Sequence, residues 1–133
     1  MGHEDSARIE DALFAGAQRQ PGATAVLDGT QTASYRDLAN RVLRLADRLV
    51  SAGVEPNQRV VIYLNKTLDS VVALYAAWAA GAVAVPANEG LRSRQVQHIV
   101  TDSEATLVIS EARKLSRLDG RPGGPPAARA RTG

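Results

Sequence analysis

The side chains that could carry out chemistry are few in this 133-residue chain. It has no cysteine and only two histidines, His3 and His98, so disulfides and thiolate- or histidine-based metal sites are not expected. Only two of its 16 basic residues are lysines, Lys66 and Lys114. His98 adjoins the apolar Ile99 and has no nucleophile or acid set around it. The sequence therefore predicts no catalytic residue, no cofactor-binding residue and no metal ligand.

The best candidate for ligand contact is the triplet Asn65, Lys66 and Thr67, which follows the apolar segment "RVVIYL". Open α/β sheets place ligands at the carboxyl ends of their parallel strands. A helix cap and a solvated lysine account for the same three residues more simply. We therefore assign no site to them.

Two pairs of adjacent carboxylates, Glu4-Asp5 and Glu10-Asp11, lie near the start of a predicted helix. Negative charge is favourable there because of the helix dipole. Adjacent side chains on a helix do not face each other, so neither pair is expected to work as a general acid and base.

Turn and helix signals organise the first half of the chain. We expect a short amphipathic helix over residues 8–18, then a hairpin with strands at 23–27 and 30–34. An Asp-Gly turn at residues 28–29 joins the strands, because glycine readily supplies the positive φ that such a turn needs. A longer helix begins at Ser34, whose spacing to an acidic residue three positions later resembles a capping box, and it stops at Gly53.

Short apolar segments alternate with helical patterns in the second half. We expect strands at 59–64, 83–86 and 106–110, with helices at 68–80 and 92–102 between them. Buried strands linked by helical crossovers indicate a parallel sheet with right-handed connections.

Residues 70–88 contain no charged side chain, and this run approaches the ~20 residues of a membrane span. The run is rich in alanine, which contributes little to membrane insertion, and it is broken at Gly81 and Pro86. We read it as a buried helix followed by a core strand, with no membrane partner. Tyr75 and Trp78 on that helix are expected to pack in the core.

The basic character of the chain, with a pI of about 9.4, comes from its last 17 residues. Residues 117–133 carry four arginines and one aspartate, a net of +3, so residues 1–116 carry 2 − 3 = −1. A nucleic-acid partner for the body is therefore not expected. The Arg/Gly/Pro/Ala-rich tail lacks a core-forming pattern and is predicted to be disordered. A binding arm remains an alternative, and the prevalence of amino acids whose codons are GC-rich favours translation past a frameshift or junction.

Two segments carry a family resemblance. "SYRDL" at residues 34–38 and "AAWAAGAVAVPAN" at residues 76–88 resemble, in order and spacing, the first two core motifs of the AMP-forming adenylate-forming ligases. That superfamily includes acyl-CoA synthetases, luciferases and peptide-synthetase adenylation domains. The resemblance covers about residues 8–115 and leans toward acyl-CoA ligases. It implies an α/β fold: an N-terminal helix and β-hairpin followed by a βαβαβ parallel unit, as an incomplete N-terminal subdomain.

The resemblance also implies a reaction. Full-length members use ATP and Mg²⁺ to convert a carboxylate into an acyl-adenylate, from which a thiol displaces AMP. They need a glycine-rich phosphate loop with a lysine, an acid for magnesium and ribose, and a lysine from a C-terminal domain. None of these is present here, since Gly123-Gly124 precedes two prolines and neither lysine lies in a glycine-rich loop.

We therefore expect a truncated ligase fragment, inactive alone, with a partial subdomain at 1–116 and a tail at 117–133. One alternative is half of a split ligase completed by a partner chain. Another is a non-catalytic interaction module. The N-terminus lacks the apolar core of a signal peptide, so a cytoplasmic location is expected.

The helix at 68–80 leads to a physical expectation, because it is apolar over most of its girth. Leaving about 400 Å² of it in water would forfeit on the order of 10 kcal/mol at about 25 cal/mol per Å². Self-association, or docking to a complementing ligase fragment, would cover that surface.

Overall fold

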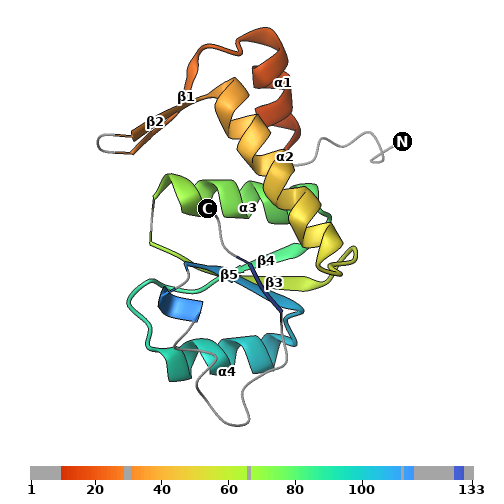
Figure 1. Ribbon diagram of the computed structural model, residues 1–133, viewed down its shortest axis with the longest axis vertical. Coiled ribbons are helices and arrows are strands. Elements are labelled where there is room, and N and C mark those ends of the chain that lie inside the picture. The colour runs from red at the N-terminus through yellow and green to blue at the C-terminus, as the bar shows by residue number, and fades with distance from the viewer. Residues whose placement is uncertain (1–9, 29–30, 66, 112, 116–127, 131–133) are drawn as a thin grey trace.

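The computed structural model describes residues 10–28, 31–65, 67–111, 113–115 and 128–130 (Figure 1). Several residues discussed above lie outside these ranges: His3, the Glu4-Asp5 pair, Gly29 of the predicted turn, Lys66, and most of the tail including Gly123-Gly124.

The N-terminal part consists of α1 (Asp11–Arg19), the antiparallel pair β1 (Thr24–Asp28) and β2 (Gln31–Ser34), and α2 (Tyr35–Ser51). Ser34 caps α2, because its Oγ accepts a hydrogen bond from the Asp37 N–H at 3.1 Å. The helix ends before Gly53, whose φ of +101° is a conformation that glycine adopts without strain. The predicted helix, hairpin and cap are confirmed.

The second part is an alternation of strands and helices. Its elements are β3 (Arg59–Tyr63), α3 (Leu68–Ala79), β4 (Val83–Pro86), α4 (Ser93–Ser103), β5 (Leu107–Ser110) and β6 (Ala128–Ala130). The strands form one sheet in the order β4-β3-β5-β6, and every neighbouring pair is parallel. The chain therefore crosses β3 on its way from β4 to β5. The predicted α/β class and parallel unit are confirmed.

Helices cover both faces of this sheet. In Figure 1, α2 and α3 lie on one side and α4 on the other. Val60 and Ile62 pack in the core under α2 and α3, whereas Val61 and Tyr63 pack in the core under α4. Side chains alternate between the faces of a strand, so two covered faces explain why "RVVIY" is apolar at nearly every position.

The charge-free run divides into α3 and β4, and Gly81 separates them with a φ of +80°. No helix among the described residues is long and apolar enough to cross a membrane. α2 packs on α3 and covers part of it, and Arg41 of α2 also pairs with Asp69 of α3 at 3.2 Å. Four larger side chains of α3 stay only half-buried: Val71, Leu74, Tyr75 and Trp78.

The strand β6 was not predicted. It comes from the tail, and it pairs in register with β5 from Leu107 opposite Ala128 to Ile109 opposite Ala130. Disorder therefore does not describe these three residues. The pattern "ARA" carries too little apolar content to indicate a strand, so its pairing depends on the edge that β5 offers.

Candidate functional site at the carboxyl edge of the sheet

The carboxyl edge of the sheet has a switch point between β3 and β5. The chain leaves β3 toward α3 on one face, whereas after β5 it turns to the other face, where Leu115 joins the core under α4. Neighbouring strands whose connections diverge in this way leave a crevice between them, and open α/β sheets bind ligands there. Geometry therefore makes this crevice the first place to look for a site.

Lys114 lies at this switch point, with only 8% of the residue exposed. Its Nζ donates a hydrogen bond to Asn65 Oδ1 at 3.1 Å and lies 4.4 Å from the centre of the Tyr63 ring. Glu111 Oε1 lies 3.8 Å from the same Nζ. We call Tyr63, Asn65, Glu111 and Lys114 the Lys114 cluster. Its contacts balance a buried ammonium with an amide oxygen, a carboxylate and an aromatic face.

Two further hydrogen bonds hold the cluster in place. Ser110 Oγ donates to the Tyr63 carbonyl, joining the ends of β5 and β3. The Tyr63 hydroxyl donates to the carbonyl of Leu91, which precedes α4. Tyr63 is thus held through both its backbone carbonyl and its hydroxyl, and Lys114 lies over its ring.

The predicted triplet is only partly gathered here. Asn65 belongs to the Lys114 cluster, and Lys66 lies outside the described residues. Thr67 is the N-cap residue of α3, with its N–H donating to Ser70 Oγ at 3.2 Å, as a helix cap predicts. Lys114 was missed as a partner. The available signal was its position four residues beyond the end of β5 in a chain with only two lysines.

Replacing Lys114 with methionine is expected to lower the free energy of unfolding by about 1–3 kcal/mol, because Asn65 and Glu111 lose their charged partner. Urea denaturation measures the change. The matched control is Arg113→Met, since the Arg113 side chain is 74% exposed and meets Glu111 only at 3.9 Å. The control should change stability by less than about 0.5 kcal/mol. Equal effects of the two substitutions would contradict the role given to Lys114.

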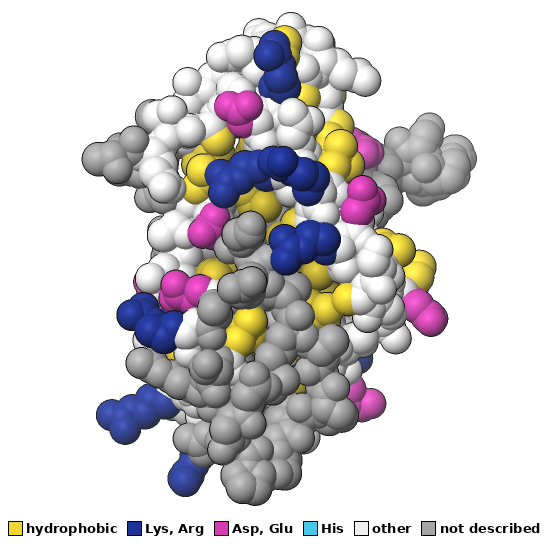
Figure 2. All heavy atoms as spheres, viewed as in Figure 1, with side chains coloured by type: hydrophobic (Ala, Val, Ile, Leu, Met, Phe, Trp, Pro, Cys, Tyr) yellow, Lys and Arg dark blue, Asp and Glu magenta, His cyan; other side chains and the backbone are white. Residues whose placement is uncertain are grey.

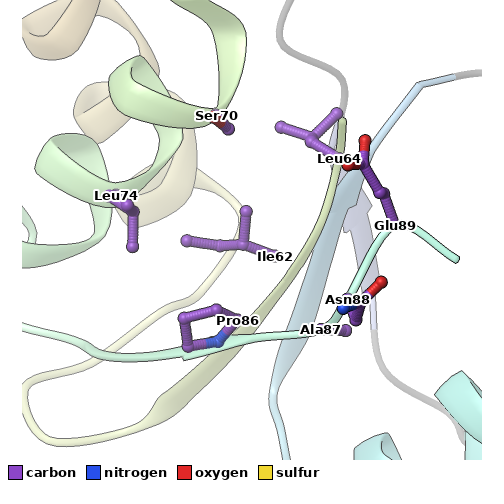
Figure 3. Close-up of a pocket in the computed structure, with 8 residues that line it drawn as sticks. All are labelled: Ile62, Leu64, Ser70, Leu74, Pro86, Ala87, Asn88 and Glu89. Atoms are coloured by element: carbon purple, nitrogen blue, oxygen red, sulfur yellow. The ribbon is translucent and has the colours of Figure 1, made fainter. Parts of the chain in front are cut away.

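A second feature at this edge is an apolar pocket of about 210 Å³ between α3 and the ends of β3 and β4 (Figure 3). We call it the edge pocket, and it is lined by Ile62, Leu64, Ser70, Leu74, Pro86, Ala87, Asn88 and Glu89. In Figure 3 the side chains of Ile62, Leu74 and Pro86 point toward one common space.

Neither the Lys114 cluster nor the edge pocket fits a nucleoside triphosphate or Mg²⁺. No group of three or more His, Cys, Asp or Glu residues that could hold a metal occurs in the described part of the chain. Lys114, the basic side chain of the Lys114 cluster, is nearly buried and hydrogen-bonded to Asn65. The edge pocket is mainly apolar, so it offers little to a phosphate. We therefore derive no chemical step at this edge.

The other residues that the sequence singled out lie away from the carboxyl-edge features. Tyr75 and Trp78 meet edge to face with ring centres 5.4 Å apart, and Tyr75 packs against the core. His98 is exposed on α4, and Glu10, the N-cap residue of α1, is buried. On the face shown in Figure 2, basic and acidic side chains are interspersed and form no continuous basic patch among the described residues.

Comparison with known proteins decides the family. The profile of the AMP-binding enzyme family matches residues 13–129, most of the chain. The chain belongs to this family. Syringomycin synthase SyrB1 of Pseudomonas syringae pv. syringae is 37% identical over 107 residues, which are 80% of this chain and 17% of SyrB1. The chain thus spans less than a fifth of the length of SyrB1, so the activity of SyrB1 is not assigned to this chain.

Solved AMP-binding enzymes share the fold. The nonribosomal peptide synthetase FmoA3, bound to AMPPNP, superposes with a TM-score of 0.84 at 26% identity, over 98% of this chain and 14% of the FmoA3 chain. The N-terminal domain of FACL13 from Mycobacterium tuberculosis superposes with a TM-score of 0.84 at 23% identity, over 95% of this chain and 34% of that domain. The chain is thus a fragment-sized member of the adenylate-forming ligases. Its lean toward acyl-CoA ligases stays a prediction.

Proposed function

We propose that residues 1–133 form a structural part of the N-terminal domain of an adenylate-forming ligase and do not adenylate a carboxylate alone. The full family reaction joins a carboxylate to AMP, releases pyrophosphate and then passes the acyl group to a thiol. This chain supplies the sheet and helices on which such a domain is built. The ATP and Mg²⁺ contacts, and the lysine of the mobile domain, come from elsewhere.

One observation carries the proposal. The chain matches the AMP-binding family over residues 13–129, yet at its described carboxyl edge the lysine is buried and the pocket is mainly apolar. A family match in which the described carboxyl edge offers no residues suited to hold a nucleotide supports a scaffold role. The remaining ligase residues would then come from outside residues 1–133, and the cytoplasm, where ATP is available, suits that reaction.

The test is carboxylate-dependent exchange of pyrophosphate into ATP. We expect the purified chain to show no exchange above background with a panel of amino, aryl and fatty acids, because its sequence contains no glycine-rich loop with a lysine to hold phosphates and stabilise charge at the α-phosphate. Exchange by the chain alone, abolished by removing the carboxylate, would overturn the proposal. The DNA downstream of codon 116, read in all three frames, shows whether a continuing ligase sequence is encoded there.

A further inference from the structure

The edge pocket lies beside an open edge of the sheet. Within the described part of the chain, β4 pairs only with β3. Val83 donates its N–H to the carbonyl of Gln58, and Ala87 donates its N–H to the carbonyl of Ile62. Alternate residues of the strand therefore direct their backbone N–H and C=O groups toward β3. The backbone groups of Ala84 and Pro86 therefore point away from β3 toward the open edge, and Pro86 has no N–H to donate there. This edge is suited to side-chain packing and poorly suited to the addition of a long strand.

The residues at the floor of the pocket are buried, whereas those at its rim are more exposed. Ile62, Leu64 and Ala87 are buried, at 4%, 9% and 6% exposure. Leu74 and Ser70 are half-buried, and Pro86 is exposed. The volume of about 210 Å³ falls below the roughly 300–1,000 Å³ of small-molecule sites. An apolar depression of this size suits an anchoring side chain of a protein partner.

The part of the family domain that this chain does not include is the candidate occupant of the pocket. It corresponds to 34% of the FACL13 N-terminal domain, so about two thirds (100 − 34 = 66%) of that domain has no counterpart here. That portion must pack against the shared part, and half-buried apolar side chains are where such packing is missing. On this face they continue beyond the pocket along α3, at Val71, Tyr75 and Trp78.

We propose that the edge pocket receives an apolar side chain from the remaining portion of an adenylate-forming N-terminal domain. This inference rests on the proposed function and gives it a location. It predicts that the pocket face of α3 becomes buried when that portion is present. The outer face of α2 is predicted to stay accessible, because Leu43, which is 48% exposed, lies there among the exposed polar residues Asn40 and Asp47, three and four positions away on the helix.

The absence of cysteine from the chain allows a direct test by thiol labelling. Leu74→Cys places one thiol in the edge pocket, and Leu43→Cys places the control thiol on α2. Each variant is prepared as the isolated chain and as a fusion in which it replaces the matched 107 residues of SyrB1. Alkylation of each engineered cysteine is followed by peptide mass spectrometry, which distinguishes it from any other thiol in the fusion.

We expect the thiol at position 74 to react at least about tenfold more slowly in the fusion than in the isolated chain, because a covered group reacts only when the cover opens. The thiol at position 43 should react equally fast in both. Equal rates at position 74, or slowing at both positions, would overturn the inference. Slowing at position 74 that grows with the concentration of the isolated chain would identify a second copy as the occupant and also overturn it.

The outcome is separable from that of the proposed function. Pyrophosphate exchange by the isolated chain would overturn the proposed function without altering the labelling result. A fusion that exchanges pyrophosphate while the thiol at position 74 stays reactive would overturn only the inference about the pocket.

Discussion

Replacing Leu49 with alanine is expected to lower the free energy of unfolding by about 2–5 kcal/mol. Leu49 is fully buried at 0% exposure near the end of α2, within the core that this helix shares with α3 and the sheet. Alanine removes apolar contacts and leaves a cavity that the packed surroundings fill only in part. Since domains of this size are stable by about 5–15 kcal/mol, the loss is a large fraction of the total.

Urea denaturation followed by circular dichroism measures the effect, as a shift of the midpoint without a change in slope. The matched control is Leu43→Ala on the same helix, because Leu43 is 48% exposed. It should change stability by less than about 0.5 kcal/mol. Similar losses for the two variants would mean that α2 does not pack on the body of the protein as described.

Enlarging Ala76 to leucine is expected to destabilise the fold by about 1–3 kcal/mol. Ala76 lies on α3 at 0% exposure, beside Ala73 and Ala77, which are equally buried. Small side chains on this helix let α2 and the sheet approach closely, so three added carbons have no space. Leucine and alanine are both good helix formers, so helix propensity does not explain the loss.

Thermal unfolding followed by the fluorescence of Trp78, the single tryptophan, reports the change close to the substitution. Ala15→Leu is the control, because Ala15 is exposed in the middle of α1. We expect its midpoint to stay within the error of the parent protein. If Ala76→Leu matched the parent as well, α3 would have room that a close-packed interior does not leave.

Local signals in the sequence were sufficient to predict most elements. The strand predicted at 83–86 is β4 at Val83–Pro86, and the helix predicted at 68–80 is α3 at Leu68–Ala79. Gly81 and Pro86 mark these boundaries, because glycine adopts a positive φ without strain whereas proline has a fixed φ and no N–H, and both effects are local. The family followed from two such segments in the correct order.

The tertiary structure alone decided which distant residues meet. Asn65 and Lys114 are 49 residues apart in the chain, yet they form a hydrogen bond because β5 lies beside β3. The strand order, the packing of α2 on α3 and the pairing of β6 with β5 are likewise arrangements between elements. Apolar periodicity states which face of an element must be buried but not which surface buries it. For this reason the sequence determined the helices, the strands β1 to β5 and the family, whereas β6, the Lys114 cluster and the edge pocket emerged only when the elements were packed together.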